Sequence, residues 1–153
     1  MMTDKNRAFF SRHARTRARR SIIQAYYQLQ IGKQPFKDIL NEFEADRSEL
    51  KKADIEYFKT VFKGMVEASD MLDGYIAPLM DRPVKDLDPV ERAVLHLGCY
   101  ELLHCPEMPW RAIINEAVEL ARMFGAEQSH KYINSILDKL AQQIRSEDIS
   151  ATS

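Results

Sequence analysis

Apolar side chains recur at intervals of three and four residues along almost the whole of this 153-residue chain. Such spacing places them on one side of an α-helix, whereas a half-buried strand alternates apolar and polar residues one by one. Glycine and proline, the residues that most often interrupt helices, number only five and six. The pattern predicts an all-α fold with helices over residues 12–31, 36–45, 48–66, 68–81, 88–104, 109–124 and 127–143.

The helix expected over 88–104 has the clearest start signal and the least polar surface. Asp88 suits an N-cap, Pro89 suits the first helical position, and Glu91 can complete a capping box. Apolar residues lie on nearly all sides of this helix, so we expect it to be the central helix of a bundle. Gly125 is expected to end a later helix in the left-handed conformation of a C-cap glycine.

The length predicts one domain, and the proline-interrupted stretch 80–89 is expected to join two halves of it. No apolar run approaches the roughly 20 residues that span a bilayer, so we expect a soluble, cytoplasmic protein without a membrane partner. We expect a flexible basic tail over residues 1–11 and a second flexible tail over residues 146–153. Between them we expect one helical domain, 12–145, with sub-bundles over about 12–81 and 84–145.

Six arginines and no acidic residue lie between Arg7 and Arg20. Residues 1–20 hold seven lysines and arginines against one aspartate, a net charge of +6, whereas residues 21–153 hold fifteen against twenty-two, a net charge of −7. Because the planar guanidinium group binds phosphate oxygens in pairs and stacks on bases, the basic segment favours a nucleic-acid partner.

Two other interpretations of the basic segment stay open. Mitochondrial transit peptides are also rich in arginine, and basic amphipathic helices bind anionic membranes. Against a transit peptide, the apolar stripe that begins at Ala14 and Ala18 continues without a break at Ile22, beyond the basic segment. Against a membrane helix, only Phe9 and Phe10 are available as large apolar anchors.

Cysteines, histidines and carboxylates show no pattern of a catalytic or metal site. Cys99 and Cys105 lack partner spacing, and we expect them to be buried thiols rather than a disulfide. His96 and His104 lack metal spacing, and we expect them at the surface or its boundary. The carboxylates lack a partner nucleophile in any legible pattern. These residues therefore predict no catalytic or metal site, and no cofactor is expected.

Four strings of the sequence resemble the NusB family of transcription antitermination factors. They are an arginine-rich run leading into QAYY (24–27), LDPVERAVLHLGCYELL (87–103), INEAVELARMFG (114–125) and SHKYINSILDKL (129–140). The resemblance covers roughly residues 12–145 and is strongest over 87–140.

The resemblance implies two small helical bundles and a protein that acts by binding rather than by catalysis. It implies NusE, a small-subunit ribosomal protein, as partner, boxA single-stranded RNA as ligand, and a role with the RNA polymerase antitermination complex in ribosomal RNA transcription. A related domain occurs in some ribosomal RNA methyltransferases. The alternatives are therefore a helical protein-interaction module without RNA, or an accessory domain of an RNA-modifying enzyme.

Binding of single-stranded RNA needs cations for the phosphates and flat side chains for the bases. On an ideal helical wheel, Arg12, Arg15 and Arg19 form a stripe beside the apolar one and are expected to face out, while Arg20 and Tyr27 share a second exposed line. The resemblance places Arg15, Arg17 and Arg19 on basic positions of the family motif.

The resemblance adds a second set of RNA-binding candidates around the turn at Gly125: Phe124, Gln128, Lys131 and Tyr132. For Phe124 and Tyr132 the residues themselves leave the hydrophobic core as an alternative. Glu91, expected beside an exposed helix cap, and Tyr27 are implied to face NusE.

Overall fold

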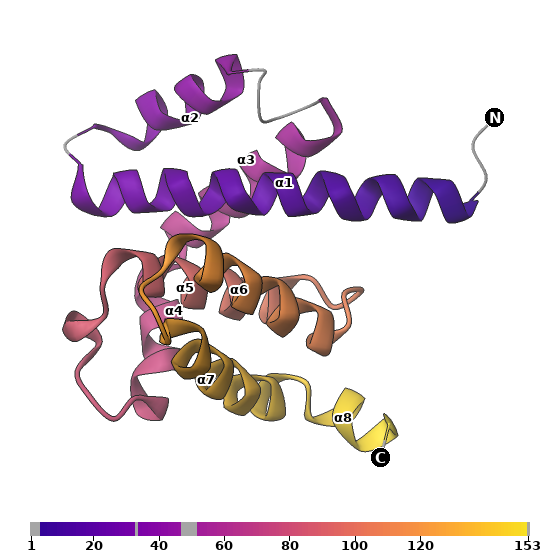
Figure 1. Cartoon of the computed structure of the whole chain (residues 1–153), viewed down its shortest axis with the longest axis vertical. Helices are drawn as coiled ribbons and strands as arrows, with labels where there is room; N and C mark the ends of the chain where they lie inside the picture. Colours follow the sequence, from indigo (N-terminus) through magenta and orange to yellow (C-terminus); the bar gives the residue numbers. More distant parts are fainter. Residues whose placement is uncertain (1–3, 33, 47–51, 153) are drawn as a thin grey trace. The chain divides into compact units, whose positions relative to one another are not determined.

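The structure, a computed structural model, describes residues 4–32, 34–46 and 52–152. All regular structure in these ranges is helical (Figure 1), which confirms the predicted all-α class. The elements, with two 3₁₀ turns marked η, are α1 Asp4–Ile31, α2 Phe36–Ala45, α3 Lys52–Glu67, α4 Ser69–Ile76, η1 Ala77–Leu79, η2 Val84–Asp86, α5 Pro89–His104, α6 Trp110–Phe124, α7 Ser129–Ile144 and α8 Ser146–Thr152.

The predicted helices are all present, with differences at both ends of the chain. Helix α1 begins at Asp4 rather than at residue 12; the stretch 4–11 contains no glycine or proline, and Lys5, Arg7 and Ala8 within it are good helix formers. Helix α8 covers residues for which a flexible tail was expected, and Glu147 and Asp148 in its first turn complement the helix dipole. The predicted start of the third helix, at residue 48, lies outside the described residues.

The chain forms two compact units, one up to Lys63 and one from Gly64 onward. Their boundary falls within α3, earlier in the chain than the stretch 80–89 at which we expected the division. In the first unit, α1 packs on α2. The rings of α2 and α3 form an aromatic series, with centroid distances of 4.9 Å for Phe36–Phe62 and 5.6 Å for Phe58–Phe62.

Helix α5 is the centre of the second unit, as predicted. It packs against α4, α6 and α7 (Figure 1), and most of its side chains are buried. A Cβ atom on Gly98 would lie 2.8 Å from Cδ2 of Leu137, so the absence of a side chain there lets α5 and α7 approach closely. The two cysteines are free and buried, and burial raises the pKa of the Cys99 thiol to about 12.

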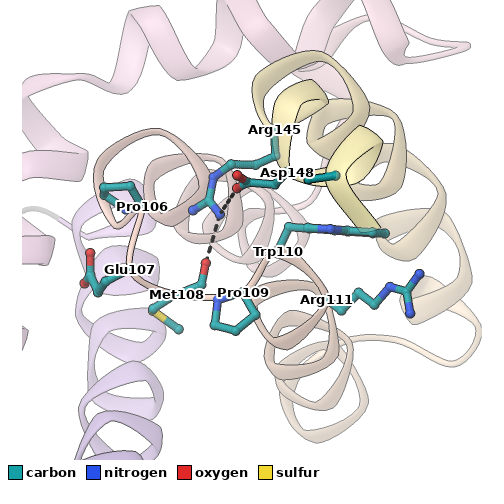
Figure 2. Close-up of a pocket in the computed structure, with 9 residues that line it drawn as sticks. Pro106, Glu107, Met108, Pro109, Trp110, Arg111, Arg145 and Asp148 are labelled. Carbon is teal, nitrogen blue, oxygen red and sulfur yellow. Dashed lines mark hydrogen bonds and ion pairs between the residues drawn. The ribbon is translucent and has the colours of Figure 1, made fainter. Parts of the chain in front are cut away.

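The predicted start signal of α5 is confirmed. The backbone N–H of Glu91 donates to Oδ1 of Asp88 at 2.8 Å, the backbone N–H of Asp88 donates to Oε1 of Glu91 at 3.3 Å, and Pro89 occupies the first turn. At its other end, Arg145 donates to the carbonyl oxygen of Leu102 at 2.9 Å and to that of Met108 at 2.9 Å, the second of which is drawn in Figure 2. This buried guanidinium therefore satisfies carbonyl groups where α5 ends.

The left-handed conformation predicted for Gly125 is wrong. Gly125 is extended, with φ −93° and ψ 173°, and Gln128 takes the left-handed conformation instead, with φ 73°. A Cβ atom at Gly125 would lie 2.6 Å from Oγ of Ser129 and 2.7 Å from the carbonyl oxygen of Ala121. Gly125 is thus suited to its position by close packing rather than by its backbone angles.

Candidate functional site

The arginines of α1 fall into two groups. Arg15, Arg17 and Arg20 are partly exposed, whereas Arg19 is only 2% exposed. The guanidinium carbons of Arg15 and Arg19 lie 5.1 and 5.7 Å from the ring centroid of Tyr57 in α3. The side chain of Arg12 lies outside the described residues.

The expectation that Arg19 faces outward is therefore wrong. A helical wheel shows the faces of one helix but not the residues of other helices that pack on them. It therefore could not show that Tyr57 of α3 lies over the arginine stripe of α1. A guanidinium over an aromatic face is a favourable cation–π arrangement, so Arg19 can be buried without losing all electrostatic compensation.

Tyr27 lies on the surface, as the sequence predicted. Its side chain is 37% exposed, and Ile31, one turn further along α1, is more exposed still. Two apolar side chains exposed one turn apart on a helix are suited to contact with another molecule.

The second set of candidates surrounds the turn between α6 and α7. Phe124 ends α6 and is half-buried, Gln128 and Lys131 are exposed, and Tyr132 in the first turn of α7 is half-buried. The structure thus brings two flat side chains, one amide and one cation to the same turn. Those groups are chemically suited to unpaired bases and a phosphate backbone.

Arg82 belongs to this region, although the sequence analysis did not select it. Its guanidinium carbon lies 4.5 Å from the centroid of the Tyr132 ring, and the Tyr132 hydroxyl donates to Oδ1 of Asp81 at 3.3 Å. Arg82 precedes Pro83, and a residue before proline is restricted to extended conformations. The Arg82-Pro83 pair was therefore a weak signal in the sequence that the backbone at Arg82 has a defined conformation.

Glu91 is buried, and the expectation of a site beside an exposed cap is wrong. Its residue exposure is only 8%, because the capping box directs the carboxylate back toward the backbone of Asp88. Nη2 of Arg82 lies 3.5 Å from the other carboxylate oxygen. Burial raises the pKa of Glu91, against the lowering effect of the Asp88 backbone and Arg82.

His96 is fully buried, so its predicted place at the surface is wrong. Its Nε2 lies 2.6 Å from Oδ1 of Asp73 in α4, whose Oδ2 accepts from Nη2 of Arg92 at 2.7 Å. Burial lowers the pKa of His96 to about 4. Burial alone would raise the pKa of Asp73, but the hydrogen bonds from Arg92 and His96 lower it. This cluster ties α4 to α5.

No chemistry beyond binding emerges from these residues. In the described part of the chain, no group of three or more His, Cys, Asp or Glu residues could hold a metal ion. Across the same residues, no helix has both the length and the hydropathy for a membrane span. A hollow lined by Pro106, Trp110 and Asp148 among others (Figure 2) contains none of the predicted site residues.

The fold and these residues define an all-helical protein with an arginine-rich first helix and an aromatic turn. The sequence profile of the NusB family matches residues 16–142. The transcription antitermination protein NusB of Thiobacillus denitrificans is 48% identical over 132 residues, which are 86% of this chain and 90% of that protein. The corresponding protein of Marinobacter nauticus is 43% identical over 86% of this chain and 82% of its own length. The chain belongs to the NusB family.

Solved structures agree with this assignment. The structure of NusB from T. maritima superposes with a TM-score of 0.77 at 32% identity, covering 84% of this chain and 90% of that one. A structure described as the antitermination factors NusB and NusE in complex with double-stranded RNA gives a TM-score of 0.71 at 23% identity, covering 86% and 98%. The latter similarity supports the fold alone. The curated relatives above are named as antitermination proteins, in agreement with a function in binding rather than catalysis.

Proposed function

We propose that this chain is a cytoplasmic transcription antitermination factor that binds boxA single-stranded RNA together with NusE and thereby supports ribosomal RNA transcription. The observation that carries the proposal is the family match, which extends over residues 16–142 and so includes α1 from residue 16 onward and the turn before α7. Helix α1 and this turn hold the partly exposed arginines and the half-buried rings described above.

In this proposal, α1 binds phosphates and the α6–α7 turn contacts bases. Arg15, Arg17 and Arg20 supply partly exposed cations, and Arg12 continues the same basic segment in sequence. Phe124 and Tyr132 supply rings for unpaired bases, with Gln128 and Lys131 beside them. Arg19 is buried and contacts the Tyr57 ring, so it is not assigned a phosphate contact.

Fluorescence anisotropy with labelled RNA tests the proposal. We expect tighter binding to boxA RNA than to a scrambled single strand or a duplex of the same length, and a further gain when NusE is added. Equal affinity for all three RNAs, with and without NusE, would contradict it. A helical module that only binds proteins would give no salt-dependent RNA binding at all.

Tyr27 is the accessible candidate for the NusE surface. Replacing Tyr27 by Ala should weaken NusE binding about tenfold while the melting temperature stays within a few degrees, because an exposed ring contributes little to the core. Gln24→Ala, which changes another exposed side chain of α1, is the control and should bind NusE normally. Titration calorimetry measures both, and equal affinities for the two variants would remove Tyr27 from the interface.

A further inference from the structure

Arg82 lies between Tyr132, a base platform in the proposed function, and Glu91, which the family resemblance implies for the NusE surface. It lies in the link between η1 (Ala77–Leu79) and η2 (Val84–Asp86), and α7 packs against η1. Its guanidinium carbon is 4.5 Å from the Tyr132 ring centroid, and its Nη2 is 3.5 Å from Oε2 of Glu91. One cation thus adjoins both a proposed base platform and the residue implied for the NusE surface.

The contact with the Tyr132 ring is the stronger of these two contacts. A guanidinium within about 6 Å of a ring centroid is attracted by the electrons of the ring face. The ion pair with Glu91 is at the outer limit of a hydrogen bond, and the Arg82 side chain is 40% exposed, so solvent screens the pair and its contribution is small. The carboxylate can therefore orient Arg82 without holding its charge away from a ligand.

A guanidinium plane has two faces. Because the Arg82 side chain is 40% exposed while its guanidinium carbon lies within cation–π distance of the Tyr132 ring, an unpaired base can stack on the guanidinium, as bases do on arginine planes in RNA complexes. The N–H donors at the edge of the same group can reach the phosphate that follows the base. The nearby carboxylates of Asp81 and Glu91 weaken attraction to phosphate, which favours stacking as the main contribution of Arg82.

We propose that Arg82 is a further RNA-contacting residue, which forms with Tyr132 a single layered platform for one unpaired base of the RNA. This inference rests on the proposed function and adds to it a residue outside the α1 and α6–α7 sets. Nη2 of Arg82 lies 3.5 Å from Oε2 of Glu91, so the platform adjoins the residue that the family resemblance implies for the NusE surface.

The test compares Arg82→Gln, Arg82→Lys and Lys85→Gln by anisotropy with boxA RNA in the absence of NusE. Loss of a base stack should raise the Kd of Arg82→Gln about tenfold. Arg82→Lys keeps the charge but loses the plane and should weaken binding nearly as much. Lys85→Gln removes the same charge from an exposed position in the adjoining η2 turn and should change Kd no more than about twofold.

Tyr132→Ala and the double variant Arg82→Gln/Tyr132→Ala complete a double-mutant cycle. If the two side chains form one platform, the double variant should bind only slightly more weakly than either single variant. Thermal melts accompany each measurement, and Arg82→Gln should melt within a few degrees of the unmodified protein because its side chain is substantially exposed.

The possible failures are distinguishable. If the unmodified protein does not bind boxA RNA either alone or with NusE, the proposed function is wrong; if it binds only with NusE, the variants are compared in the presence of NusE. If it binds, but Arg82→Gln behaves like Lys85→Gln, or Arg82→Lys binds like the unmodified protein, then the platform is wrong while the proposed function stands. An effect of Arg82→Gln on NusE binding alone, with RNA affinity unchanged, would equally overturn the platform.

Discussion

The carboxylate of Glu91 serves the start of α5, and this limits how its partner role can be tested. Glu91→Lys removes the acceptor for the Asp88 N–H and places a cation at a helix N-terminus beside Arg82. We expect it to lower the free energy of unfolding by about 1–3 kcal/mol, from the lost cap and the unfavourable dipole interaction. Glu91→Gln retains the capping box and should stay within about 0.5 kcal/mol of the unmodified protein in urea denaturation. Equal stability of Glu91→Lys and Glu91→Gln would contradict this account.

His96 predicts a pH dependence of stability. Because its folded-state pKa is about 4 and its ordinary value is 6.5, the unfolded chain binds more protons between these values. Stability should therefore fall as the pH drops from about 6.5 to about 4, by up to about 3 kcal/mol from this residue. Glu91, whose folded-state pKa is raised, acts in the opposite sense, since its contribution is present at low pH and lost as the pH rises through that pKa.

The variant His96→Gln isolates the histidine, because it keeps an N–H donor for Asp73 but cannot titrate. Melting temperatures recorded from pH 7 to pH 4 should decline less steeply for His96→Gln than for the unmodified protein. Parallel curves would show that His96 is not the titrating group. The same series of melting temperatures for Glu91→Gln measures the contribution of Glu91, whose effect on stability runs in the opposite direction with pH.

Single side chains were the least predictable part of the site. Arg19 and His96 were expected at the surface or its boundary, but both are buried. Arg19 contacts the Tyr57 ring of α3, and His96 is hydrogen-bonded to Asp73 of α4. A one-dimensional pattern records the faces of one helix but not what packs against them. For His96 a signal existed, since a helix without a polar face has no exposed position for a histidine near its middle.

At the level of elements, the contact of α3 with α5 in the second unit gives a steric prediction. A Cβ atom on Gly64 would lie 2.6 Å from Cε2 of Tyr100, well inside van der Waals contact. Gly64→Ala should therefore destabilise the protein by about 1–3 kcal/mol, although alanine is the better helix former by about 1 kcal/mol. The double variant Gly64→Ala/Tyr100→Leu should recover part of this loss in urea denaturation. A Gly64→Ala protein more stable than the unmodified one would contradict the contact.

The elements themselves were predictable where local chemistry decides them. The capping box at Asp88, the central position of α5 and most helix boundaries follow from residues close in sequence. Gly125 was misjudged because left-handed glycine is only the commonest reason for a glycine after a helix. Its actual cause, the approach of Ser129 and Ala121, depends on how the chain turns into α7.

At the scale of the whole molecule, charge is unevenly distributed along the chain. Residues 1–20 carry a net charge of +6 and the remainder a net charge of −7, so a polyanion is attracted to one segment and repelled by much of the rest. This unevenness was legible in the sequence without any structure. Under the proposed function, α1 sets where RNA binds and how strongly salt weakens the complex, while the aromatic turn contributes the preference among sequences.

The salt dependence of RNA binding tests this division of roles. The triple variant Arg15→Gln/Arg17→Gln/Arg20→Gln should weaken binding to boxA and scrambled RNA by the same factor, because phosphate contacts carry no sequence information. Its plot of log K against log salt concentration should flatten by about 0.7 for each lost contact with a single strand. The control Lys37→Gln/Lys63→Gln/Lys139→Gln removes the same charge from exposed positions elsewhere and should leave the slope almost unchanged. If both triple variants flatten the slope equally, net charge rather than the basic face of α1 governs binding, and the division between a positioning helix and a reading turn fails.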